Sequence, residues 1–143
     1  MNIEQFSDQD GLELAAFKAA EWPSADLQHF GEGSDYSHHK ITLICRDDAG
    51  IVGYGTLSTD SGVGHIESIL IGENYRGKGF ATQLVIAFED SAKGFECHKI
   101  WLETGSDWAA RFLYEKLGYQ RRMTLADHYG GKDFLYYDKL FKR

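Results

Sequence analysis

The sequence has little proline, little cysteine and no long apolar segment. Its 143 residues include one proline and two cysteines, and no stretch reaches the roughly 18 apolar residues of a membrane-spanning helix. Cys45 and Cys97 form no C-x-x-C pair, which favours two reduced core cysteines over a disulfide framework or a metal site. The first residues lack the basic start and apolar run of a secretory signal. We therefore expect a cytoplasmic protein that binds no metal and no membrane.

Positive charge is also in the minority. The chain has 22 acidic and 15 basic residues, a formal net charge of −7. Because nucleic acids and anionic membranes attract basic surfaces, this balance argues against both as partners and mildly favours cationic ones such as amines. The length fits one domain over residues 1–143, which can bury roughly 68–70% of its unfolded surface.

The most informative segment is the glycine-rich stretch from Tyr75 to Leu84, which reads Y-R-G-K-G-F-A-T-Q-L. It joins the β-rich run 65–71 to a segment whose apolar residues recur at helical spacing. The N–H groups at a helix N-terminus have no intrahelical partner, and the helix dipole makes that end electropositive. Glycines let an anion approach the backbone, and Arg76 and Lys78 add positive charge. The pattern indicates a pyrophosphate cradle; a turn without a ligand is the alternative.

Two phosphate-binding loops compete for this segment. Gly72 to Gly79 nearly spells a P-loop, but a glycine stands where a P-loop needs Ser or Thr for Mg²⁺. The pattern Arg76-x-x-Gly79-x-Ala81 resembles the Q/R-x-x-G-x-G/A signature of the GNAT superfamily of acyl-CoA N-acyltransferases. That resemblance implies acetyl-CoA as co-substrate. The residues it implies for binding are Ile69, Leu70, Ile71, Arg76, Gly77, Lys78, Gly79, Phe80, Ala81, Thr82, Asp107 and Tyr114.

A second segment, from Asp107 to Tyr119, reads D-W-A-A-R-F-L-Y-E-K-L-G-Y and resembles the family's N-x-x-A-x-x-x-Y-E-K-L-G-F. The resemblance implies that Tyr114 protonates the departing coenzyme A thiolate. Asp107 stands where the family usually has Asn, and an acid cannot donate an amide hydrogen bond to the pantetheine arm. In local terms, Ser106 or Asp107 can cap a helix that Gly118 ends.

The order of predicted elements, β-α-α-β-β-β-α-β-α-β-β, is a mixed α/β fold that resembles the GNAT topology over nearly the whole chain. The elements are a strand over 1–6, a helix that the Trp22-Pro23 step ends, a short helix and polar loop within 24–39, strands 41–46, 51–58 and 65–71, the phosphate-loop helix, strand 100–102, helix 106–117, and strands 119–124 and 134–140.

Direct attack of an amine on the thioester needs a base, donors for the developing oxyanion and an acid. The resemblance assigns the donors to backbone N–H groups of the segment 69–71. Glu67 is one candidate base, because alternation places it on the strand face of Ile69 and Ile71. Glu103 is the other, since its surroundings resemble the glutamate base of ribosomal-protein N-terminal acetyltransferases, although Asp107 follows one residue sooner here.

Each of these glutamates is otherwise a plain strand carboxylate, and a base acting through water would also suffice. Alternation also places His65 with Glu67, as a relay partner or an ordinary polar position. The sequence thus predicts an N-acetyltransferase that moves an acetyl group from acetyl-CoA to a primary amine, of a small molecule or of a protein N-terminus. A catalytically silent acyl-CoA sensor and a nucleotide-binding protein are the alternatives, and the C-terminal strands are a candidate dimer surface.

Overall fold

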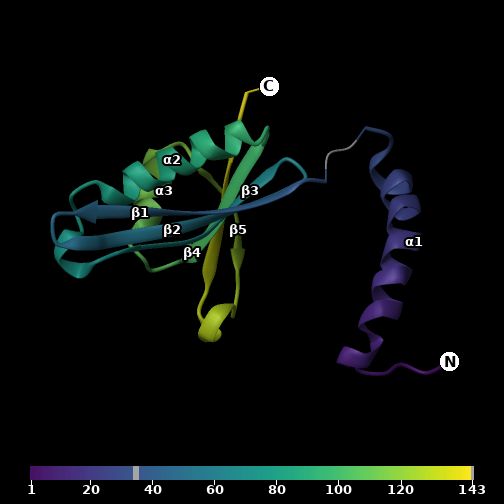
Figure 1. Cartoon of the computed structure of the whole chain (residues 1–143). Coiled ribbons are helices and arrows are strands. Elements are labelled where there is room, and N and C mark those ends of the chain that lie inside the picture. Colours follow the sequence, from purple (N-terminus) through teal and green to yellow (C-terminus); the bar gives the residue numbers. More distant parts are fainter. Residues whose placement is uncertain (34–35, 143) are drawn as a thin grey trace. The chain divides into compact units, whose positions relative to one another are not determined.

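The computed structural model describes residues 1–33 and 36–142 (Figure 1). The chain forms two compact units, one within residues 1–34 and one within residues 35–143. The first unit contains a 3₁₀ turn, η1 (Asp8–Asp10), and one helix, α1 (Gly11–Phe30). Two residues of the loop predicted within 24–39, Ser34 and Asp35, lie outside the described part of the chain.

Two predictions for the N-terminal unit are wrong. Residues 1–6 form no strand, and the six-stranded sheet contains no segment from them. Helix α1 continues through Pro23 and ends at Phe30, so the separate short helix predicted within 24–39 is part of α1; the N–H of the C-cap residue Gly31 donates to the Leu27 carbonyl at 3.0 Å. Proline removes one backbone hydrogen bond and its ring crowds the carbonyl four residues before it, which weakens the helix locally. Alanine has the highest helix propensity of all residues, and the alanine-rich segment before Pro23 outweighs the effect of the proline.

The second unit contains a six-stranded mixed sheet in the order β1-β2-β3-β4-β6-β5. All neighbouring strands are antiparallel except β3 and β4, which run parallel. The predicted strands of this unit are confirmed, most of them longer than expected. Their bounds are β1 (His38–Asp47), β2 (Gly50–Asp60), β3 (Val63–Ile71), β4 (Lys99–Gly105), β5 (Gln120–Leu125) and β6 (Phe134–Leu140).

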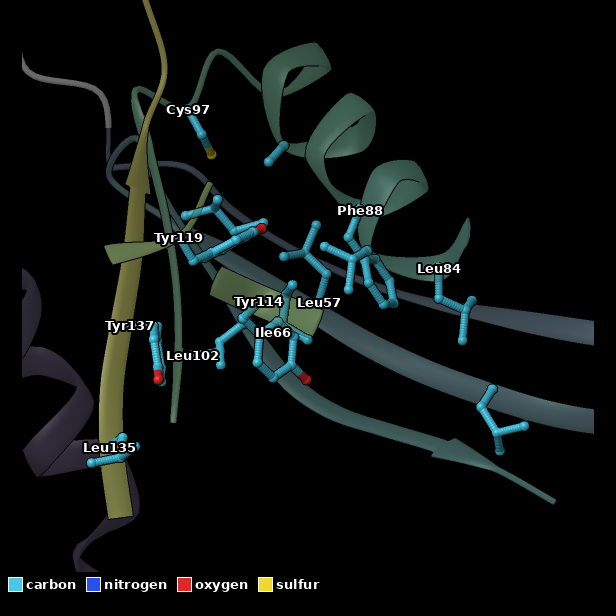
Figure 2. Close-up of a cluster of buried hydrophobic side chains, with 14 residues drawn as sticks. Leu57, Ile66, Leu84, Phe88, Cys97, Leu102, Tyr114, Tyr119, Leu135 and Tyr137 are labelled. Atoms are coloured by element: carbon cyan, nitrogen blue, oxygen red, sulfur yellow. The ribbon is translucent and has the colours of Figure 1, made fainter. Parts of the chain in front are cut away.

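Two helices cover one face of this sheet. Helix α2 (Phe80–Gly94) crosses from β3 to β4, as a parallel strand pair requires, and α3 (Ala110–Lys116) follows β4. Short 3₁₀ turns, η2 (Glu73–Tyr75) and η3 (Tyr129–Gly131), precede α2 and β6. The core forms between these helices and the sheet (Figure 2). Its fully buried members include Leu57, Val85, Phe88, Ile100, Leu102 and Tyr137.

The core also holds a charged pair. Lys139 Nζ donates to both carboxylate oxygens of Glu89, each at 3.0 Å, and to the Leu117 carbonyl at 3.0 Å. Glu89 is only 7% exposed, so this pair removes a helix carboxylate from water and satisfies it. Among the described residues, no helix is both long and apolar enough to span a membrane.

Candidate active site

The parallel strands β3 and β4 pair over only three residues each. Val63 to His65 lie opposite Lys99 to Trp101, and beyond that point the described strands are not paired with each other. The segment 66–71 of β3 therefore lacks a strand partner on its β4 side, which leaves backbone groups there free for a ligand. This opening confirms the splay that the predicted fold needs.

A cavity of about 320 Å³ lies at the end of β3, beside the glycine-rich loop. Helix α2 begins after Gly79, and the first intrahelical bond runs from the Gln83 N–H to the Gly79 carbonyl, 3.1 Å. The N–H groups of the first turn are thus left without helical partners. Seven predicted binding residues line the cavity together with Tyr75 and Leu113: Ile71, Arg76, Gly77, Gly79, Phe80, Ala81 and Thr82.

Gly77 and Gly79 have positive φ angles, +72° and +88°, which side-chain-bearing residues rarely adopt. A Cβ atom built at either position would meet nothing within 4 Å. Backbone conformation therefore requires glycine here, and open space lies above both residues. An anion that approaches this helix N-terminus meets unpaired N–H groups without steric hindrance. The loop fits the pyrophosphate of coenzyme A.

The two basic side chains of the loop are placed differently. Arg76 Nε donates to the Ile71 carbonyl at 3.0 Å, so this side chain ties the loop to the end of β3 as well as lining the cavity. Lys78 does not line the cavity; its Nζ lies 5.4 Å from the centre of the Tyr75 ring. A hydrogen bond to the Asp47 carboxylate and its charge raise the pKa of Tyr75.

Tyr114 lies in α3, next to the cavity-lining Leu113, and is 8% exposed (Figure 2). Its ring centre is 5.9 Å from that of Tyr119 and 6.3 Å from that of Tyr137. Burial raises the pKa of Tyr114 to about 12, so the phenol is protonated at neutral pH. It can therefore donate a proton.

The predicted cap of α3 is wrong. The helix begins at Ala110, with Ala109 at the N-cap and no side-chain cap bond, because the chain turns at residues 106–107 instead. Asp107 is exposed, outside the helix, and it does not line the cavity. Leu70 is also exposed and lies outside the cavity, while Ile69 packs against the core.

The predicted face of Glu67 is wrong as well. Thr56 lies opposite Ser68 and Leu57 opposite Ile66, so Glu67 is the extra residue of a β-bulge. The bulge shifts the alternation, and Glu67 leaves the face on which the core isoleucines lie. Its carboxylate is 3.1 Å from Lys40 Nζ. Hydrogen bonds from Ser58 and Lys40 lower the pKa of Glu67.

Glu103 lies on β4, two residues beyond the last residue paired with β3. Its Oε2 is 3.6 Å from Nε2 of His65, and its Oε1 accepts a hydrogen bond of 3.5 Å from the Tyr129 hydroxyl. The side chain is 17% exposed. In contrast to Glu67, Glu103 contacts no lysine or arginine within the described residues.

The sequence did not point to the contact between His65 and Glu103 or to Tyr129. Strand pairing brings His65 and Glu103 together across more than thirty residues of sequence. No local pattern reveals that pairing. The signal that contains Tyr129 is the segment 127–135, which loosely resembles the Y-Y-x-x-x-D-A tail of protein N-terminal acetyltransferases. Within residues 1–33 and 36–142, no group of three or more His, Cys, Asp or Glu side chains is arranged to hold a metal ion.

Comparison with known proteins places this geometry in a family. Residues 8–119 match the family model described as the acetyltransferase (GNAT) family. An uncharacterized N-acetyltransferase of Methanocaldococcus jannaschii is 32% identical over 133 residues, 90% of this chain and 84% of that protein. An N-alpha-acetyltransferase of Saccharolobus solfataricus is 40% identical over 73 residues, which cover 49% of this chain and 44% of that protein.

Solved structures show the same fold. An acetyltransferase from Bacillus cereus superposes with a TM-score of 0.78 at 24% identity, covering 99% of this chain and 98% of its own. A Bacillus anthracis protein assigned as a streptothricin acetyltransferase, in complex with acetyl coenzyme A, gives a TM-score of 0.66 at 23% identity, covering 77% of this chain and 65% of its own. With this fold, the family model and the relatives in agreement, the chain belongs to the GNAT family of acyl-CoA-dependent acetyltransferases.

Proposed function

We propose that the protein transfers the acetyl group of acetyl-CoA to a primary amine, with Glu103 as general base and Tyr114 as general acid. The observation that carries the proposal is the opening between β3 and β4. The cavity under the glycine-rich loop lies at the end of β3, and Glu103 lies at the mouth of the opening on β4. When bound, acetyl-CoA supplies an acetyl group activated as a thioester.

Each group of the proposed site transfers one proton or stabilises one charge. Glu103 accepts a proton from the acceptor ammonium, and the unpaired backbone N–H groups of β3 stabilise negative charge on the thioester oxygen. Tyr114 donates its phenolic proton to the departing thiolate. The acceptor nitrogen loses a second proton as the amide forms, so one proton is released in net terms.

Three observations favour Glu103 over Glu67 as the base. Glu67 is held by Lys40 at 3.1 Å, and its lowered pKa makes it a weaker proton acceptor. Within residues 1–33 and 36–142, Glu103 has no basic partner except the histidine beside it. Both carboxylates still give the mouth negative charge, which favours a cationic acceptor. The N-terminal amine of a peptide or the amine of a small molecule, each with an unperturbed pKa below that of lysine, would demand the least of this base.

The test begins with binding. Saturating acetyl-CoA is expected to raise the melting temperature by several degrees, and ATP with Mg²⁺ to leave it unchanged. Release of free thiol is then measured with small primary amines and with peptides that carry a free N-terminus. N-acetylated peptides serve as controls. Binding without turnover on any amine would establish a silent acyl-CoA sensor instead.

Two matched variants test the base. Glu103→Gln is expected to lower kcat/KM by roughly 10²–10⁴ while acetyl-CoA still binds, because the amide cannot accept the proton. Glu67→Gln replaces the neighbouring carboxylate by an amide in the same way, and it should change kcat/KM by less than about tenfold. The opposite ranking would assign the base to Glu67.

A further inference from the structure

His65 faces the carboxylate of Glu103 across the opening between the strands. Its Nε2 lies 3.6 Å from Glu103 Oε2, and both side chains are largely buried, at 26% and 17% exposure. Within the described residues this Nε2 is a buried atom without a hydrogen-bond partner. A buried polar nitrogen that points at a carboxylate is costly unless the two interact.

The ring of His65 is held in place by stacking. Its centre lies 3.7 Å from that of Trp101, with the planes only 2° apart, and Trp101 stacks in turn on Tyr136 at 5.2 Å. The parallel register places His65 directly opposite Trp101, so both side chains leave the same face of adjacent strands. The flat contact fixes the imidazole plane, and with it the direction of Nε2.

We propose that His65 is a positioning residue, which holds Glu103 oriented toward the acceptor amine and weakens it as a base when the imidazole is protonated. This inference rests on the proposed function. In the neutral state the Nε2–H hydrogen faces Oε2 of Glu103, and Oε1, on the side of Tyr129, accepts the ammonium proton. The N–H bond of the ammonium breaks, and its electron pair stays on the nitrogen that attacks the thioester.

The surroundings of His65 support a neutral resting state. Burial lowers the pKa of His65, while the charges of Glu103 and Glu67 oppose that shift. Lys40 partly neutralises Glu67, and on the stacked side Trp101 packs on Tyr136, whose ring centre lies 5.5 Å from Nζ of Lys99. At acid pH the imidazolium would form an ion pair with Glu103. A carboxylate engaged by a cation accepts a proton less readily.

Two substitutions of His65 separate positioning from structure. His65→Gln keeps an N–H donor at a similar reach but cannot titrate, and His65→Leu removes the donor while keeping bulk. We expect kcat/KM for His65→Gln within about threefold of wild type at pH 8, and a loss of roughly tenfold or more for His65→Leu, mainly in kcat. The acid limb of the pH profile should move to lower pH in His65→Gln, since only Glu103 then titrates.

An NMR titration of the His65 ring provides a readout that does not depend on activity. In the ligand-free protein, Glu103→Gln should lower the pKa of His65, because it removes the carboxylate charge that opposes desolvation. An unchanged ring titration in that variant overturns the inference, as does an acid limb in His65→Gln that coincides with wild type. Absence of turnover by the wild-type protein would instead refute the proposed function and leave this titration interpretable.

Discussion

Replacing Gly79 by Asp or by Asn tests the phosphate cradle with a change of charge alone. The two side chains have nearly the same size, and a Cβ at this position meets nothing within 4 Å, so neither variant creates a clash. Both residues must adopt a φ of +88°, which costs roughly 1–2 kcal/mol of stability in either case. The difference between the variants is therefore one negative charge at the mouth of the cavity.

The size of that difference follows from Coulomb's law. Two unit charges about 4 Å apart repel by about 1 kcal/mol in water and about 4 kcal/mol at an effective dielectric constant near 20. Gly79 is exposed, so the lower value applies, and two pyrophosphate charges make it about 2 kcal/mol. Calorimetric titration with acetyl-CoA should thus give a Kd about 30-fold higher for Gly79→Asp than for Gly79→Asn. The ratio should shrink in 1 M salt, where the Debye length is about 3 Å.

A matched pair at Gly94 supplies the control. Gly94 ends the same helix, and a Cβ there also meets nothing within 4 Å. It lies about 21 Å from the helix start, so Gly94→Asp and Gly94→Asn should bind acetyl-CoA within about twofold of each other. Equal affinities for the two Gly79 variants at low salt would show that no phosphate lies at this loop, and the placement of the cradle would be refuted.

Two further predictions concern the core beside the site. Tyr114→Phe should lower kcat by about 100-fold with the Kd for acetyl-CoA unchanged within about twofold, because the ring still packs while the proton donor is lost; full turnover in single-turnover assays would remove Tyr114 from the mechanism. Lys139→Met should lower the free energy of unfolding by about 3–5 kcal/mol, since it leaves the Glu89 carboxylate buried and unpaired. Urea unfolding measures the free energy of unfolding of this variant and of the double variant Glu89→Leu/Lys139→Met. The double variant should recover most of the lost stability. An equal loss of stability in both variants would show that the cost comes from packing and not from the unpaired carboxylate.

The parts of the fold that local sequence determines were predicted well. The glycine-rich loop and α2 follow from neighbouring residues, since helical spacing and glycine positions act over a few residues. The same is true of the β1–β2 hairpin. By contrast, Pro23 shows where a local signal is outweighed, because one missing N–H does not end a helix whose neighbours favour it. The element order was therefore wrong only in the N-terminal unit.

The arrangement of charged groups at the site depends on pairing between distant strands. His65 and Trp101 are brought together by the parallel register of β3 and β4, and Glu103 then lies within reach of the imidazole. The crossover helix and the core fix a parallel register, so no local pattern in the residues between His65 and Trp101 reveals it. The functional candidates could be named from the sequence, but their partners could not.

The bulge in β3 shows how one extra residue changes which side chains share a strand face. Glu67 and Glu103 each lie two residues beyond the last paired positions of their strands, so a regular sheet would present both carboxylates alike. The extra residue at Glu67 shifts Ile69 and Ile71 to the opposite face, while Glu67 stays on the face of Ser58, where Lys40 binds it. Glu103 stays in register and faces His65. A period of two assumes an unbroken strand, and the bulge that breaks it separates Glu67 from the face of Ile69 and Ile71.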